Sequence, residues 1–145
     1  MHIDFVFYSC DFDEAERGAI ALGLNDIEVV SCAKFRPATT ADKDWVVIDH
    51  QESGCSATLG YYGPGHGAHS INLERAAPGS TSTCVAKSVV IHEALHIMGV
   101  QHEQSRPDRD EYITINWHKM EVSRKWYQSI KYTNICKFYL DRTGI

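Results

Sequence analysis

The amino-terminal segment begins with an alternation of apolar and polar side chains. Ile3, Phe5 and Phe7 alternate with Asp4 and Tyr8. Successive side chains of a strand point to opposite faces of a sheet, so this alternation predicts a first β-strand.

The next segment has the spacing of an amphipathic helix. Its apolar residues recur three or four positions apart and widen into a stripe, which comprises Phe12, Ala15, Ala19, Ile20, Leu22, Leu24 and Ile27. Asp11, followed three residues later by Glu14, has the pattern of a helix N-cap. We therefore expect a helix that packs on a sheet, weakened by Gly18 and Gly23 because glycine is a poor helix former.

Three later segments are predicted to be strands. Residues 45–48 are apolar at every position, which favours a strand buried on both faces. Residues 55–59 and the alternating residues 70–74 are shorter candidates. Proline and polar residues at positions 37–43 are typical of a connection between elements.

Residues 84–98 are predicted to form a central helix that is apolar nearly all round and therefore buried. His92 and His96 are four positions apart, so they lie on one helix face and can bind a single metal ion. Gly99 permits a left-handed backbone at the end of the helix, after which His102 can complete a set of three imidazoles.

Glu93 follows His92 directly and is rotated by about a quarter-turn, so it can reach the open side of the metal without being a ligand. Three protein ligands leave a fourth position for water, which marks a catalytic rather than a structural zinc site. We expect Glu93 to act as general base on that water. Two histidines on a helix are often ordinary core residues, but the longer spacing that includes Gly99 and His102 is far more demanding.

A second pair of histidines, His66 and His69, lies in a segment rich in glycine. A second metal site is one interpretation of this pair. No carboxylate or cysteine lies at ligand spacing, so we expect exposed loop histidines instead.

Length and composition limit the remaining possibilities. A chain of 145 residues is long enough for one domain with a sizeable core. A net charge of −5 gives no basic patch for nucleic acid, and no apolar run approaches membrane-spanning length. The opening apolar run is too short for a secretory signal. Five cysteines favour an oxidising compartment, with one cysteine left without an intrachain partner.

Residues 92–102 resemble the long zinc motif of the metzincin metallopeptidases, and the residues after His102 resemble the astacin family in particular. In that family a glutamate and then an Arg-x-Asp-Arg-Asp run come after the third histidine, as do Glu103 and residues 106–110 here. Residues 113–117 also fit the family. The likeness reaches back to about Phe12 and so covers most of the chain up to residue 117.

The resemblance implies an α/β (α+β) fold in which a metzincin-like amino-terminal subdomain carries a twisted mixed sheet and two long helices. It implies one zinc ion per chain, polypeptide substrates and secretion. On this basis we expect residues 1–117 to form the catalytic subdomain and residues 118–145 a short divergent tail. The oligomeric state and the preferred cleavage site are not indicated.

The resemblance also assigns roles to particular residues. It implies a disulfide between Cys55 and Cys84, and one between Cys32 and Cys136 that leaves Cys10 as the remaining thiol. It implies that Glu103 is buried. It makes one strand, including Ile71, Asn72 and Leu73, the sheet edge with which an extended substrate pairs; an unpaired edge is a physical template for an added strand.

Two features of the family are not found in this sequence. None of Met1, Met98 and Met120 has the context of the methionine turn below the zinc, and few residues come after Trp117. We therefore expect a chain truncated before that turn, with most of the carboxy-terminal subdomain missing. Two functions remain open: a zinc endopeptidase, or a catalytically impaired zinc-binding fragment that binds peptides or proteins. A zincin with a distant glutamate as third ligand is disfavoured by His102.

Overall fold

The computed structural model describes residues 2–7 and 11–120. The chain forms two units, Met1–Met98 and Gly99–Ile145, which are considered separately. Among the described residues, no helix is long and apolar enough to cross a membrane.

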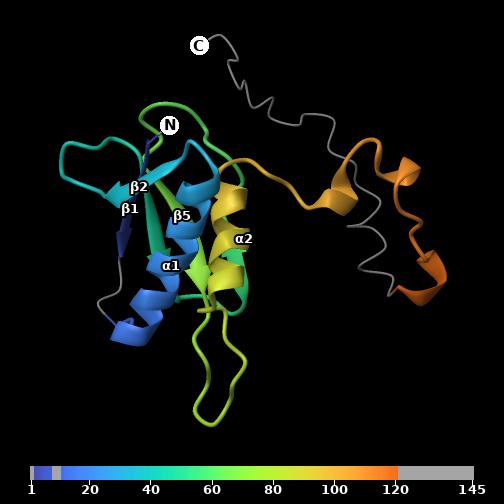
Figure 1. The fold of residues 1–145 in the computed structure, drawn as a ribbon, viewed down its shortest axis with the longest axis horizontal. Helices are drawn as coiled ribbons and strands as arrows, with labels where there is room; N and C mark the ends of the chain where they lie inside the picture. Colours follow the sequence, from blue (N-terminus) through green and yellow to red (C-terminus); the bar gives the residue numbers. More distant parts are fainter. Residues whose placement is uncertain (1, 8–10, 121–145) are drawn as a thin grey trace. The chain divides into compact units, whose positions relative to one another are not determined.

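The first unit is a five-stranded mixed sheet with two helices on one face (Figure 1). Its strands are β1 (His2–Phe7), β2 (Lys34–Pro37), β3 (Trp45–Asp49), β4 (Cys55–Ala57) and β5 (Ala68–Leu73), in the spatial order β2-β1-β3-β5-β4. All neighbouring pairs are parallel except β4 and β5. The helices are α1 (Glu14–Val30) and α2 (Lys87–Ile97). The expected twisted mixed sheet with two helices is confirmed.

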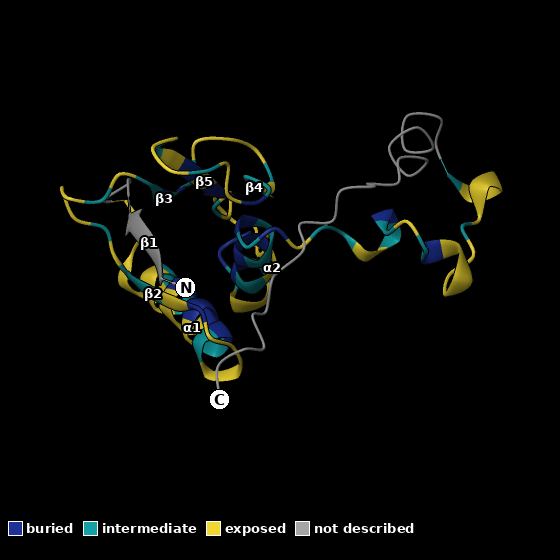
Figure 2. Cartoon of the chain, turned by 90° about the horizontal axis from the view of Figure 1, so that it is seen from above, coloured by how far each residue is buried: buried dark blue, intermediate teal, exposed yellow. Residues whose placement is uncertain are grey.

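The core lies between the sheet and the two helices, which pack side by side (Figure 2). Its largest fully buried side chains are Phe12, Ile20, Ile48, Ile71, Leu73 and Val90. The opposite face of α1 is exposed, whereas only Lys87, Ser88 and His92 of α2 are exposed and its other residues are buried or half-buried (Figure 2). The expected burial of α2 is therefore confirmed for most of the helix, but not at these three positions.

Helix α1 begins at a capping box that differs from the expected one. Asp13 accepts a hydrogen bond from the Glu16 N–H at 2.8 Å, and Glu16 accepts one from the Asp13 N–H at 2.8 Å. This reciprocal arrangement satisfies two backbone donors at once. The N-cap is therefore Asp13 rather than Asp11.

Two strand assignments also need correction. Strand β2 was not expected, because Lys34 and Arg36 leave it with little apolar pattern; as an edge strand it tolerates Pro37. In β3, Val46 and Ile48 are buried but Trp45 is only partly covered, so the second face of β3 is half-exposed.

The described part of the second unit, residues 99–120, contains three short 3₁₀ helices, Glu103–Ser105, Arg109–Glu111 and Trp117–Lys119. Arg109 is 4% exposed and donates to the carbonyl of Gln104 at 2.9 Å. Arg106 forms ion pairs with Asp108 and Glu103. Glu103 is exposed, so the burial expected for it is wrong.

Candidate metal centre

Helix α2 carries the candidate metal ligands and begins at Lys87, three residues later than expected. The residues before it are held in a non-helical conformation. The Cys84 N–H donates to the carbonyl of Glu74 at 2.8 Å, and the Val85 N–H donates to the hydroxyl of Thr83 at 3.0 Å. These bonds replace the first helical turn, so α2 has 11 residues.

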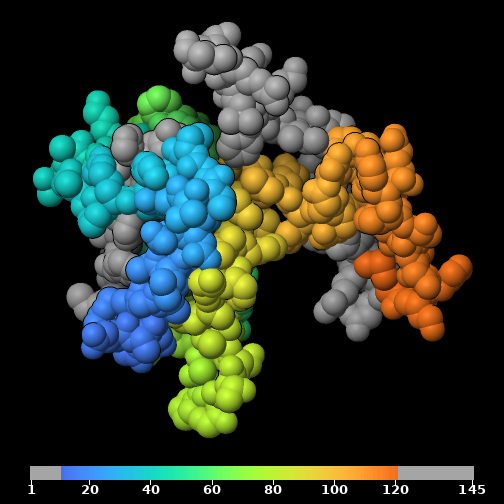
Figure 3. Space-filling model, viewed as in Figure 1, coloured from blue at the N-terminus to red at the C-terminus, as the bar shows by residue number. Residues whose placement is uncertain are grey.

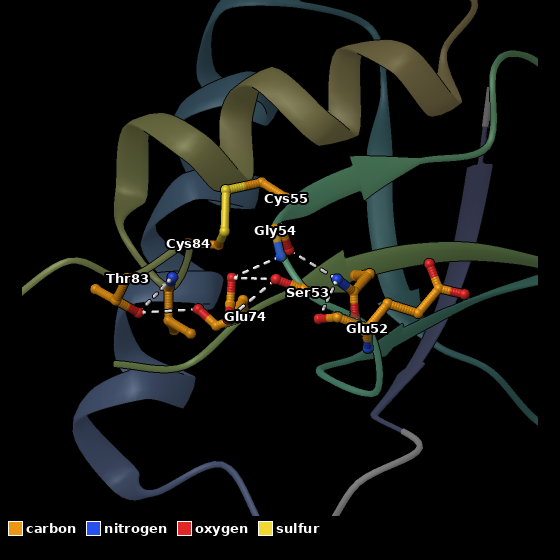
Figure 4. Close-up of a disulfide and its surroundings, with 9 residues drawn as sticks. Glu52, Ser53, Gly54, Cys55, Glu74, Thr83 and Cys84 are labelled. Atoms are coloured by element: carbon orange, nitrogen blue, oxygen red, sulfur yellow. Dashed lines mark hydrogen bonds between the residues drawn. A yellow bond between two sulfur atoms is a disulfide. The ribbon is translucent and has the colours of Figure 1, made fainter. Parts of the chain in front are cut away.

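The segment before α2 is tied to the sheet by a disulfide (Figure 4). Cys55 of β4 and Cys84 are bonded, which confirms the expected pairing. The Glu74 carboxylate accepts a hydrogen bond from the Gly54 N–H at 2.6 Å, close to the same bridge. Residues 74–86 project from the first unit beyond the helices (Figure 3), and these interactions fix the base of that projection.

Two imidazoles of α2 converge on one point. The Nε2 atoms of His92 and His96 are 3.1 Å apart. In a tetrahedral site with zinc–nitrogen bonds of about 2.0–2.1 Å, two ligand nitrogens are separated by roughly 3.3 Å. The positions of these two nitrogens therefore fit a shared zinc ion.

A third histidine completes the donor set. Among the residues that the structure describes, one group of three potential metal ligands was found: His92, His96 and His102, whose ligand atoms all lie within 4.8 Å of one another. Gly99 has a φ of 89°, so the helix ends in the left-handed conformation expected from the sequence. Three neutral imidazoles are a donor set that suits zinc.

Glu93 lies on the buried side of α2 and is 3% exposed. Its Oε2 atom is buried and has no hydrogen-bond partner in the described part of the chain. Burial raises the pKa of Glu93 above its ordinary value, and the charges of His96 and His92 partly oppose this shift. A buried carboxyl group with one unpaired oxygen, next in sequence to a candidate metal ligand, is suited to proton transfer.

The sheet edge nearest α2 is β4, which corrects the expected position of the substrate edge. Strand β5 lies between β3 and β4, and β4 covers the residues Ile71, Asn72 and Leu73 by antiparallel pairing. The Asn72 side chain donates to the carbonyls of Glu52 and Gly54, so it holds the turn before β4. These three residues are therefore inside the sheet rather than at its edge.

The two glycine-loop histidines differ in their environment. His66 is exposed, as expected. His69 lies in β5 opposite Val46 and is 5% exposed, so the expectation for His69 is wrong. Its ring is covered by Tyr61 and Tyr62, which stack on it. Neither tyrosine was predicted from the sequence, where the only local signal is an aromatic pair between Gly60 and a glycine-rich loop.

Cys32 is exposed and forms no disulfide with another described residue. Cys10 and Cys136 lie outside the described residues. The Cys32–Cys136 linkage therefore stays a prediction, as does the division of the chain at residue 117.

Comparison with known proteins identifies the family. Residues 1–137 match the model of the Astacin peptidase family, a range that continues past residue 117, where the resemblance was expected to end. The chain therefore belongs to the astacin family.

Curated relatives include two zinc metalloproteinases of Caenorhabditis elegans. The zinc metalloproteinase nas-13 is 33% identical over 114 residues, which are 79% of this chain and 23% of the relative. The zinc metalloproteinase nas-15 is 32% identical over 114 residues, which are 79% of this chain and 18% of that protein. The chain thus spans about a quarter or less of the length of these relatives.

Solved structures agree on the fold. High choriolytic enzyme 1, a hatching enzyme zinc-protease from Oryzias latipes (Medaka fish), matches with a TM-score of 0.74 and 27% identity over 90% of this chain and 59% of that one. The structure of myroilysin matches with a TM-score of 0.54 and 18% identity over 89% of this chain and 58% of that one, which supports the fold alone.

Proposed function

We propose that the chain is a zinc-dependent endopeptidase that hydrolyses peptide bonds of polypeptides. The observation that carries the proposal is the convergence of the ring nitrogens of His92, His96 and His102. Glu93, which follows His92 in the sequence and is buried, supplies the general base that peptide-bond hydrolysis needs. The family's zinc metalloproteinases support the same reaction class.

In this proposal the three imidazoles would hold one zinc ion per chain. The ion would supply Lewis-acid chemistry to peptide-bond hydrolysis. Glu93 accepts a proton from the attacking water and then donates it to the leaving amine. The buried position of Glu93 keeps its carboxyl group away from competing solvent, because only 3% of the residue is exposed.

Strand β4 binds the backbone of the substrate in this proposal. It ends the strand order, so one side of its backbone is not paired with any strand among residues 2–7 and 11–120. An extended peptide can add to such an edge through main-chain hydrogen bonds. The Gly60 N–H donates to the carbonyl of His96 at 2.8 Å, which brings the segment after β4 to the metal-binding end of α2.

We assign the site of action to the extracellular space. The Cys55–Cys84 disulfide supports this assignment, because such bonds form and persist mainly in oxidising compartments.

The test is hydrolysis of a quenched fluorescent peptide library by the zinc-loaded chain. We expect cleavage that disappears on chelation and in Glu93→Gln, and that persists in Glu14→Gln, which alters an exposed carboxylate at the start of α1. Zinc bound tightly without any cleavage would refute the endopeptidase proposal. In that case peptide binding by the same chain would favour the alternative, a zinc-containing binding module.

A further inference from the structure

Two adjacent tyrosines form an exposed aromatic surface directly after β4. Tyr61 is 58% exposed and Tyr62 is 62% exposed. Both rings stack on His69, with ring centroids 5.7 and 5.4 Å away and interplanar angles of 29°. We call these three residues the tyrosine platform. His69 is the buried support of the platform, and the two tyrosines are its exposed surface.

The platform is held by a network of hydrogen bonds. The Tyr61 hydroxyl donates to the Asp44 carboxylate at 3.0 Å. The same carboxylate accepts hydrogen bonds from the N–H groups of Gly65 and Gly67, each at 2.9 Å. Both glycines have positive φ angles, which a residue with a Cβ adopts only with strain. The loop that contains Gly65 and Gly67 is therefore preorganised, so binding of a ligand to the platform costs little free energy for ordering this loop.

The polar groups of the platform leave its ring faces as the surface available to a ligand. The Nε2 atom of His69 is buried, and both tyrosine rings stack on the His69 ring. The carboxylate of Asp44 already accepts hydrogen bonds from Tyr61, Gly65 and Gly67, so it offers little attraction to a cationic side chain.

The platform follows the edge strand β4 in the sequence and lies close to the metal helix. The Gly60 N–H is bonded to the carbonyl of His96, so the chain passes the metal helix immediately before Tyr61. Antiparallel pairing is the more stable way for a peptide to extend an edge strand. Such a peptide runs opposite to β4, so its amino-terminal part lies beside the residues after β4, namely residues 58–62.

We propose that the tyrosine platform is a subsite for an aromatic side chain of the substrate, on the amino-terminal side of the scissile bond. This inference rests on the proposed function and names a substrate preference for it. Aromatic rings stack on exposed tyrosine faces with a gain equivalent to about two- to tenfold in affinity. Tyr61 and Tyr62 act through binding and make no contribution to proton transfer.

The test compares quenched peptides that differ only by phenylalanine or alanine at each position before the cleaved bond. For the native chain we expect kcat/KM to be about two- to tenfold higher with phenylalanine at one of these positions. The phenylalanine preference should fall to about onefold in Tyr62→Ala and persist in Tyr62→Phe, which keeps the ring. Leu22→Ala is the matched control, because Leu22 is exposed to a similar extent (58%, against 62% for Tyr62) but lies on α1. An unchanged preference in Tyr62→Ala would overturn the subsite.

A binding measurement separates this inference from the proposed hydrolysis. The phenylalanine and alanine peptides are titrated into zinc-loaded Glu93→Gln, with and without Tyr62→Ala, and followed by fluorescence anisotropy. Tighter binding of the phenylalanine peptide that depends on Tyr62 supports the platform even if the native chain cleaves nothing. Equal affinity for both peptides overturns the platform even if hydrolysis is found.

Discussion

Gly23 of α1 packs tightly against Val90 of α2, with no room for a side chain at position 23. A Cβ atom at position 23 would lie 2.9 Å from the Cβ of Val90 and 3.1 Å from the carbonyl oxygen of Lys87. Gly18, also in α1, has no neighbouring atom within 4 Å of such a Cβ. The two glycines thus have different structural roles, although both are simply poor helix formers by sequence.

This difference predicts opposite effects of the same substitution. Gly23→Ala should lower the free energy of unfolding by about 1–3 kcal/mol, because it forces apart two packed helices. Gly18→Ala should raise it by roughly 0.5–1 kcal/mol through better helix propensity. Urea denaturation of both variants beside the native chain measures the two changes. A stabilising effect of Gly23→Ala would contradict the close packing of α1 against α2.

The pattern of apolar residues predicted most helices and strands of the first unit, because the pattern of a helix or strand lies within its own segment of the sequence. The alternation around Phe5 and the helical spacing around Ile20 are local properties. Strand β2 was missed because Phe35 is its only large apolar side chain. Its place in the sheet comes from backbone pairing with β1, which leaves no local signal in the sequence.

The candidate site was likewise predicted only in part from the sequence. The helical spacing of His92 and His96 made the metal-binding face predictable from the sequence alone. The edge strand was placed wrongly, because β4 and β5 both have short strand patterns and only their long-range pairing decides which lies outside. The burial of His69 likewise depends on Tyr61 and Tyr62, which reach it from the loop after β4.

The Cys55–Cys84 disulfide should make a large contribution to stability. It closes a segment with a sequence separation of 29 residues. A loop of this size corresponds to about 3–4 kcal/mol in the chain-entropy model. We expect the double variant Cys55→Ala/Cys84→Ala to lose about that amount in urea denaturation, while Ser56→Ala on the same strand stays within about 0.5 kcal/mol. A loss below about 1 kcal/mol would contradict the prediction.

The second predicted disulfide requires a direct test. A peptide map under non-reducing conditions should contain a fragment that links Cys32 to Cys136. If both cysteines are recovered as free thiols from freshly prepared protein, the linkage implied by the family resemblance is wrong. Recovery of the Cys55–Cys84 fragment in the same map serves as the internal control.

Asp44 should make the stability of the chain sensitive to acid. The hydrogen bond from the N–H of Gly65 is the largest cause that holds the pKa of Asp44 below its ordinary value of 3.8. Burial opposes this shift, and further hydrogen bonds from the N–H groups of Gly67 and His66 and from the hydroxyl of Tyr61 add to it. Because the folded-state pKa is the lower one, the ionised carboxylate stabilises the fold above pH 4. This stabilisation decreases as the pH falls below 4 and is lost below the folded-state pKa.

The measurement compares the native chain with Asp44→Asn in urea denaturation between pH 7 and pH 2. The native chain should be more stable by a constant amount down to about pH 5, and the difference should shrink at lower pH. Tyr61→Phe removes only one of these donors and should give a smaller difference of the same sign. A difference that grows as the pH falls would show that the sign of the Asp44 contribution is wrong.

From the proposed metal centre we can predict which histidines are needed for zinc binding. We expect one equivalent of zinc per chain by atomic absorption, and a loss of zinc affinity of more than about a hundredfold in His92→Ala, His96→Ala or His102→Ala. This effect exceeds the 10–100-fold change typical of residues that only support a ligand. His118→Ala, which removes an exposed histidine of the second unit, should retain full zinc content. Glu93→Gln should also retain the metal, because Glu93 is assigned to proton transfer rather than to coordination. Loss of zinc from Glu93→Gln with retention in His102→Ala would mean that the carboxylate is a ligand in place of the third imidazole.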